Sequence, residues 1–257
     1  MNQLTTNNSM ASFLSKESIK NRINEIVGAE SALFTSSLLA IARSPALSKC
    51  TPESILGSAI ISATLKLHIN QNLGYAYIVP YGNEAQFQVG YKGFIQLALR
   101  SGQFKRLNVA ALTKSQFKGF DPIAEKIEYD YNDLSDPELY CYIGYFQLTN
   151  GFEKYFVMTK EELFAHAKKY SKMFSGQYAE KSLWTTDFDN MAKKTVLKLL
   201  LSKYAPLSIE MQQAISSDQA TFDVDGNAKY IDNEKQKLTG EAKQDLNLED
   251  ITNINEE

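Results

Sequence analysis

The change of hydrophobic period near residue 75 most limits the folds open to this chain. Up to residue 67 the apolar residues recur at helical spacing. From Tyr75 to Pro80 and from Ala85 to Tyr91 they alternate with other residues, on either side of the turn Tyr81-Gly-Asn-Glu84, which predicts a β-hairpin. An amphipathic helix closed by Gly102 follows directly. Helices followed by a hairpin and a further helix predict an α+β fold.

The rest of the chain extends this pattern. Helices are expected at 15–27 with Ser15 as N-cap, at 33–43, from Thr51-Pro52 to 67, from the capping box Thr159–Glu162 to 170, at 187–204 and at 208–215. Strands are expected at 107–112, near 117, and at 126–131, 139–148 and 153–158. The predicted architecture is a small antiparallel β-sheet with a β-hairpin packed against several helices, forming a basic groove.

Polarity divides the chain into three segments. Residues 1–14 are polar and are expected to be a flexible N-terminus. Residues 15–215 hold the periodic elements and form one predicted domain. Residues 216–257 are acidic with scattered apolar residues, which is typical of a disordered tail. This tail is open to three interpretations: an inert solubilising segment, a docking peptide for another protein, or an acidic competitor of nucleic acid.

The overall charge of −3 hides a strong asymmetry. The tail holds eleven acidic and four basic residues, and residues 121–138 hold seven acidic residues and one lysine. The basic residues Lys92, Arg100, Lys105, Arg106, Lys114 and Lys118 follow one another with no acidic residue between Glu84 and Asp121. A second lysine series runs from residue 168 to residue 203. Two basic series in one domain favour a groove for a polyanion over a merely solvated face.

Lys92 has the most specific position among these cations. It lies between Gly90 and Gly93, where the hairpin ends and the next helix begins. The free amides and partial positive charge of a helix N-terminus favour an anion. The sequence therefore predicts an anion contact at Lys92.

Motifs for the commonest enzymes are absent from the sequence. It has no G-x-x-x-x-G-K-[ST] loop for ATP and no G-x-S-x-G nucleophile elbow. Two cysteines and two histidines are too few for the usual zinc site. A Mg²⁺-dependent nuclease that uses Asp121, Glu125, Glu128 and Asp130 is an alternative, although acidic residues among Asn and Pro more often form an exposed loop.

Four blocks of sequence resemble the RecT/Red-beta family of phage and prophage single-strand annealing proteins. They are 73–83 (LGYAYIVPYGN), 90–102 (GYKGFIQLALRSG), 157–160 (VMTK), and Trp184 with 189–195 (DNMAKKT) and 203–210 (KYAPLSIE). The blocks occur in order and span most of residues 50–215. The resemblance implies ATP-independent binding of single-stranded DNA and annealing of a complementary strand in homologous recombination, by an oligomeric ring or helical filament without a chemical step.

The resemblance also implies partners and a site. A partner exonuclease and the host single-strand binding protein are expected to dock on the C-terminal region. Matching positions place DNA contacts at Lys92 and Arg100 and at Lys193 and Lys194; adjacent helical residues point about 100° apart, so one of the last two is expected to face DNA. Lys105, Arg106, Lys160 and Lys198 are further candidates by charge and proximity. Trp184 and Phe94 are expected to be packing residues.

The sequence leaves a second alternative function open and gives further expectations on cofactors and location. A protein that coats one strand without annealing two would carry the same cations. No cofactor is expected to be required, and whether Mg²⁺ stimulates annealing stays open. No stretch approaches the ~18 uninterrupted apolar residues of a membrane span, and no signal peptide precedes residue 20, so no membrane partner is expected. The expected location is the cytoplasm of a bacterial host.

Overall fold

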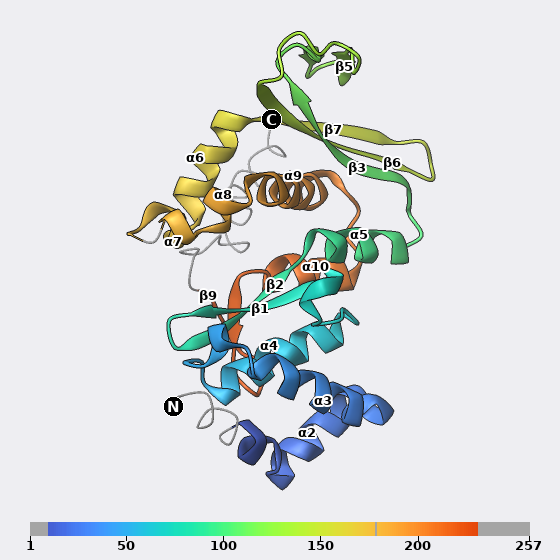
Figure 1. The fold of residues 1–257 in the computed structure, drawn as a ribbon. Helices are drawn as coiled ribbons and strands as arrows, with labels where there is room; N and C mark the ends of the chain where they lie inside the picture. The colour runs from blue at the N-terminus through green and yellow to red at the C-terminus, as the bar shows by residue number, and fades with distance from the viewer. Residues whose placement is uncertain (1–9, 178, 231–257) are drawn as a thin grey trace, which may run out of the picture.

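The computed structural model describes residues 10–177 and 179–230 (Figure 1). Three small antiparallel sheets and several helices confirm the predicted α+β class. The first sheet contains β1 (Ala76–Tyr81), β2 (Glu84–Val89), β8 (Ala220–Phe222) and β9 (Ala228–Tyr230), in that order. The second contains β3 (Phe104–Thr113), β6 (Leu139–Leu148) and β7 (Glu153–Thr159), and the third pairs β4 (Phe117–Asp121) with β5 (Lys126–Tyr129).

The N-terminal helices cover one side of the first sheet, at the bottom of Figure 1. They are α2 (Glu17–Val27), α3 (Ser31–Ala42) and α4 (Pro52–Thr64), with short 3₁₀ turns η1 (Gly28–Glu30), η2 (Pro45–Leu47) and η3 (Gln71–Leu73). The N-cap of α4 is confirmed, because the Thr51 hydroxyl accepts the Ser54 N–H and Pro52 is the first helical residue. α4 is the most buried of the three, and its Ser58 and Ser62 hydroxyls donate to the carbonyls of Ala85 and Leu67.

The β1–β2 hairpin is confirmed, with a register that runs from Ala76 opposite Val89 to Tyr81 opposite Glu84. Gly82 occupies the turn with φ of 60°, a conformation that favours glycine. The helix that follows is α5 (Tyr91–Arg100), and Gly102 with φ of 70° ends that segment as expected. The hairpin therefore delivers the chain directly into the first turn of α5.

The second sheet and its helix α9 (Phe188–Tyr204) form the other half of the molecule. The 149–151 turn joins β6 to β7 as predicted, with Gly151 at φ of 92°. α9 packs closely on β6, since Val196 and Leu200 lie about 3 Å from the place where a Cβ on Gly144 would stand. α6 (Lys160–Tyr170), α7 (Lys172–Ser175), η4 (Ala179–Lys181) and α8 (Leu183–Thr186) precede α9, and the predicted capping box of Thr159 and Glu162 opens α6. α10 (Ile209–Ser217) follows α9.

The N-terminal boundary differs from the prediction. Residues 10–14 are helical, and Met10, Phe13 and Leu14 are buried against the N-terminal helices. The expectation that Ser15 caps the next helix is wrong. Lys16 occupies the N-cap position of α2, and the Ser15 hydroxyl instead donates to the Ser12 carbonyl at 2.7 Å, because the chain is already helical before it.

The C-terminal boundary also differs. Residues 218–230 continue the fold, and β8 pairs with β2 in the register Gln86 opposite Thr221 and Phe87 opposite Ala220. Ala220 and Phe222 are buried. β8 has too few alternating apolar residues to be recognised as a strand from the sequence, and its partner strand β2 lies more than 130 residues away. The rest of the predicted disordered tail, 231–257, lies outside the described residues.

One helical stretch, Glu17–Ala42, has the length and composition that a membrane span would need. It consists of two helices, because the 3₁₀ turn η1 with Gly28 at φ of 56° separates α2 from α3. Only 11% of its most apolar window is buried inside the molecule. Most of its residues therefore lie at least partly at the surface of the helical layer, and Leu33 is its exposed large apolar residue.

A buried carboxylate joins the two halves of the molecule. Asp218, between α10 and β8, has a side chain that is 1% exposed and accepts the Val89 N–H at 2.9 Å. It also binds the Nζ atoms of Lys198 at 2.7 Å and Lys194 at 3.4 Å, both on α9. Burial raises the pKa of this carboxyl, but the two lysines outweigh that effect and hold the pKa below its usual range. Asp218 thus fastens β2 and β8 to α9.

We expect Asp218→Asn to lower the free energy of unfolding by about 3–5 kcal/mol, since Lys194 would remain buried without its counter-charge. Urea unfolding followed by circular dichroism measures this. In the wild type the charged Asp218 carboxylate stabilises the fold above its unfolded pKa, about 3.9, and this stabilisation is lost as the pH falls through the lower folded pKa. The free energies of unfolding of the two proteins should therefore converge in acid. Asp225→Asn, at an exposed position of the β8–β9 turn, is the matched control. Equal losses in both variants would contradict the assignment.

Candidate nucleic-acid interface

Backbone packing fixes the first turn of α5 against the start of the hairpin. The Gly90 N–H donates to the Tyr75 carbonyl at 2.8 Å. A Cβ on Gly90 would collide with the Gly74 carbonyl, and a Cβ on Gly93 would collide with the Tyr75 carbonyl. Both positions therefore need glycine for close approach. No side chain caps this helix end, because Gly90 is its N-cap.

Lys92 extends from this turn into solvent. Its aliphatic stem passes over Gly74, with Cδ 3.5 Å from the place where a Cβ on Gly74 would stand. The side chain is exposed, and no carboxylate of the described residues lies within ion-pair distance of its ammonium. The helix N-terminus adds partial positive charge beside it. Lys92 therefore presents an uncompensated cation on a fixed backbone.

Lys193 lies close to the same turn. Burial raises the pKa of the Tyr91 phenol, and a hydrogen bond with the Val109 backbone and the positive charge of Lys193 partly offset that rise. Lys193 also forms an ion pair with Asp189 at 2.7 Å, one turn earlier in α9. Tyr142 of β6 donates its hydroxyl to the same carboxylate at 3.1 Å. The structure thus brings the first turn of α5 and the N-terminal half of α9 together.

Lys194 and Lys198 point the other way, toward Asp218. Their ammonium groups are neutralised by its carboxylate, and the Lys194 side chain is only 12% exposed. Lys193 and Lys194 therefore diverge, as the helical offset of about 100° requires. The structure assigns Lys194 and Lys198 to the junction between α9 and β8.

Arg100 lies at the C-terminal end of α5, eight residues and roughly 12 Å from Lys92 along the helix. Its guanidinium donates to the Leu65 carbonyl at 2.9 Å and to the Lys66 carbonyl at 3.2 Å. Leu65 is the C-cap residue of α4 and Lys66 follows it, at the helix end where backbone acceptors lack intrahelical partners. Arg100 therefore ties α5 to α4, and the structure does not bring it together with Lys92.

Lys105 and Arg106 are exposed at the start of β3, shortly after Gly102. Arg106 lies opposite Gln147 in the register of β3 and β6. They extend the basic series along the second sheet, near the Arg100 end of α5.

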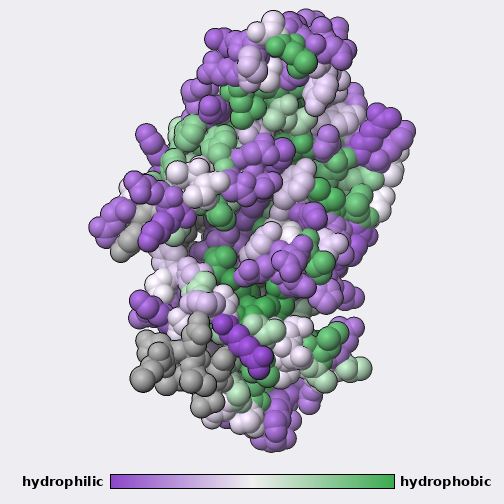
Figure 2. Space-filling view, in the orientation of Figure 1, coloured by the Kyte–Doolittle hydropathy of each residue, from purple (hydrophilic) through white to green (hydrophobic). Residues whose placement is uncertain are grey.

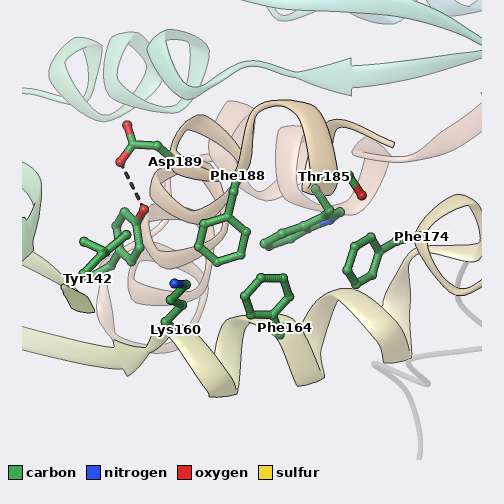
Figure 3. A pocket seen from close by; sticks show the side chains of 9 residues that line it. Tyr142, Lys160, Phe164, Phe174, Thr185, Phe188 and Asp189 are labelled. Atoms are coloured by element: carbon green, nitrogen blue, oxygen red, sulfur yellow. Dashed lines mark hydrogen bonds between the residues drawn. The ribbon is translucent and has the colours of Figure 1, made fainter. Parts of the chain in front are cut away.

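Lys160 is the first residue of α6 and lines a pocket of about 550 Å³ together with Asp189 (Figure 3). Aromatic side chains form most of the rest of this pocket: Tyr142, Phe164, Phe174, Trp184 and Phe188. Since Asp189 also binds Lys193, a continuous path of polar contacts connects Lys193 with the pocket that Lys160 lines. In Figure 2 the surface is indented between the part that holds α6 to α8 and the part that holds β1 and β2.

Two expected packing residues are confirmed. Trp184 is 5% exposed and Phe94 is fully buried, both in the core that α9 shares with the sheets. His166 lies in the same region, where burial and then the charges of Lys198, Lys169 and Lys203 lower its pKa to about 4. It is therefore neutral at pH 7 and packs as an uncharged ring between Tyr170 and Trp184.

The acidic residues proposed for a nuclease have other interactions. Asp121 accepts the N–H groups of Ile123 and Ala124 in the β4–β5 turn, and these bonds lower its pKa. Glu125 forms an ion pair with Lys154. Within residues 10–177 and 179–230 no group of three or more His, Cys, Asp or Glu side chains could hold a metal ion.

Sequence reasoning missed two features of the site. Asp218 was assigned to the tail, and nothing near it in sequence indicates its lysine partners. The sequence analysis does not name Phe164, Phe174 or Phe188, although Phe164 lies four residues after Lys160 and Phe188 lies four residues after Trp184. A weak signal existed in this clustering of phenylalanine around the only tryptophan.

The RecT family model matches residues 32–236. The uncharacterized protein YqaK of Bacillus subtilis (strain 168) is 43% identical over 213 residues, which cover 82% of this chain and 72% of YqaK. Protein RecT of Escherichia coli (strain K12) is 30% identical over 188 residues, which cover 70% of this chain and 67% of that protein.

We expect Arg100→Ala to lower the free energy of unfolding by about 1 kcal/mol, because two α4 carbonyls lose a charged donor. Thermal and urea unfolding test this, with Lys105→Ala as a control at an exposed cation that has no ion pair among the described residues. If Arg100→Ala is as stable as the control, Arg100 does not stabilise the contact between α5 and α4.

Proposed function

Because this chain belongs to the RecT family, we propose that it binds single-stranded DNA and anneals complementary strands in homologous recombination, without ATP and as an oligomeric ring or filament. The observation that carries the proposal is the arrangement of Lys92, Lys193 and Lys160. These cations come from three elements that are distant in sequence. Lys92 lies in the first turn of α5, Lys193 is close enough to Tyr91 of that turn to affect its phenol, and Lys160 lines a pocket together with Asp189, the ion-pair partner of Lys193. We infer that these three cations line the basic groove that the sequence predicts.

The chemistry of annealing fits phosphate contacts. A strand that must test complementary partners needs its backbone held and its base edges free. Lysines and a helix N-terminus bind phosphates without reading sequence. In this mechanism Lys92 and the α5 amides hold one phosphate, Lys193 and Lys160 hold others, and no bond is made or broken. The protein is therefore a binding and annealing factor and not an enzyme, and Mg²⁺ acts at most as a stimulating counter-ion.

The proposal includes the annealed duplex and two protein partners. The annealed duplex is the product that stays bound until release, and a partner exonuclease would supply the single strands. The acidic C-terminal segment beyond residue 230 is the expected docking region for that exonuclease and for the host single-strand binding protein. All of these act on DNA in the cytoplasm of a bacterial host, where we place this chain.

Oligomer contacts are proposed for the exposed apolar surface of α2 and α3. Leu33 is 62% exposed at the start of α3, beside partly exposed Phe34. A contact with a second copy of the chain would bury this apolar side chain and its partly exposed neighbour. A head-to-tail contact through this surface would generate a ring or an open helix according to whether the rotation closes.

The rate at which complementary strands pair distinguishes an annealing protein from one that only coats a single strand. Two complementary fluorescent oligonucleotides are mixed with and without protein, in nucleotide-free buffer at two salt concentrations. We expect faster pairing with protein and less acceleration at high salt, because phosphate contacts weaken with salt. Tight binding with slowed pairing would instead establish a coating protein.

We expect Lys92→Ala to weaken binding to oligo(dT) several-fold and to reduce the slope of log K against log salt by about 0.7, the value for one phosphate contact on a single strand. Fluorescence anisotropy over a salt series measures both. Lys49→Ala is the control, since Lys49 is exposed near the opposite end of the β1–β2 hairpin. An unchanged slope in Lys92→Ala would remove Lys92 from the interface.

We expect Leu33→Asp to shift the protein toward smaller oligomers, because a carboxylate in an apolar contact is costly to bury. Light scattering after size exclusion measures the mass. Asn21→Asp adds the same charge at an exposed position of α2 and is the control. If Leu33→Asp keeps the wild-type mass, the contact lies elsewhere.

A further inference from the structure

The geometry points to a base-stacking site in the aromatic pocket beside Lys160, where one nucleobase of the bound strand lies against Phe174 and Phe164 while Lys160 contacts its phosphate. This inference rests on the proposed function, because it assumes a bound single strand. It assigns a role to the pocket that the phosphate contacts leave unexplained.

The pocket is built by five elements that meet at one place. β6 supplies Tyr142, α6 supplies Lys160 and Phe164, α7 supplies Phe174, α8 supplies Trp184, and α9 supplies Phe188. Figure 3 shows the phenylalanine rings together at its centre and the Tyr142–Asp189 hydrogen bond at one side. Its volume of about 550 Å³ lies within the range of sites for small organic ligands.

The rings form a nearly parallel row. Phe164 and Phe188 stack with centroids 4.6 Å apart and planes 25° apart. Phe174 lies on the Phe164 side with centroids 6.2 Å apart and planes 28° apart. A flat ring between two parallel rings needs about 7 Å, twice the normal carbon contact distance. A shift of roughly 1 Å by Phe174 would therefore open a slot for a planar group.

Phe174 is only partly buried, at the margin of the main core. It lies in α7, a four-residue helix with no buried residue, and Gly176 follows this helix. The opposite wall is Phe164, which is backed by Phe188, and Phe188 in turn contacts Tyr142 and the buried Trp184. A wall at the margin of the core and an opposite wall backed by the core suit a ligand that inserts face-on.

The polar groups of the pocket favour a ligand that carries an anion. The Lys160 ammonium has no ion pair among the described residues, whereas Asp189 is held by Tyr142 and Lys193. A ligand with a flat π-system and an anion next to it satisfies both the rings and Lys160. A nucleotide within a strand has these two parts, and an aliphatic side chain of a protein partner has neither.

Stacking is compatible with annealing. A base held by its faces keeps its Watson–Crick edge free, and stacking tolerates every base because each has a π-face. The pocket would thus hold one base per bound protomer and set the spacing of the strand without reading its sequence.

The test compares oligo(dT) with an abasic strand of equal length, which has the same phosphates and no bases. Anisotropy titrations at two salt concentrations give affinities for the wild type, Phe174→Leu and Phe174→Tyr. We expect Phe174→Leu to weaken binding to oligo(dT) about fivefold or more and to leave abasic binding and both salt slopes unchanged. Phe174→Tyr should bind both strands like the wild type. Phe152→Leu, an exposed aromatic position on the β6–β7 turn, is the control and should change neither affinity.

Trp184, the only tryptophan, gives a direct readout because it lines the pocket. We expect oligo(dT) to quench its fluorescence and the abasic strand to leave it unchanged. Equal wild-type affinity for the two strands would overturn the stacking site, as would equal losses on both strands in Phe174→Leu. A change of oligomer mass in Phe174→Leu with no base-dependent loss would also overturn it, in favour of a protein contact. Failure to bind either strand would instead overturn the proposed function.

Discussion

The ion-pair cluster around Asp218 is the interaction on which the arrangement of the two halves depends. One carboxylate with a 1% exposed side chain holds two lysines of α9 and the last amide of β2. Val89 precedes Gly90, so the same carboxylate fixes the point where α5 begins. The position of Lys92 relative to Lys193 therefore depends on a residue that touches neither of them. Charges taken out of water need this kind of complete pairing, because a partly paired cluster costs more than an apolar one.

The lysines of α9 illustrate how one helix serves two purposes. Lys193 faces the side where Tyr91 and Asp189 lie, and Lys194 faces the interior. Of two adjacent lysines, one thus lies beside the first turn of α5 and the other in the junction between α9 and β8. The same division holds along α5, where Lys92 points into solvent and Arg100 ties the far end to α4. Basic residues in a nucleic-acid-binding domain cannot be assigned to DNA by charge alone.

Local signals explain what could be predicted from the sequence. The hairpin turn at Gly82, the capping box at Thr159 and the β6–β7 turn at Gly151 each depend on a few neighbouring residues, and each is confirmed. The boundaries at both ends of the domain depend on distant partners. Met10 is buried because α2 to α4 cover it, and Ala220 is buried because β2 accepts it as a strand neighbour. The roles of Asp218 and Arg100 were missed for the same reason, since their partners lie 20 or more residues away.

The pairing of β2 with β8 delays the completion of the first sheet. More than 130 residues separate the two strands, so the first sheet stays two-stranded until nearly all of the domain has been synthesised. During that time β2 presents an open edge, and such edges pair readily with other chains. Closure of this long loop is entropically costly and makes folding depend on non-local contacts. The segment after α10 therefore acts as the last piece of the domain, and a chain that ends at residue 215 would lack both the strand that seals the edge and the carboxylate that neutralises α9.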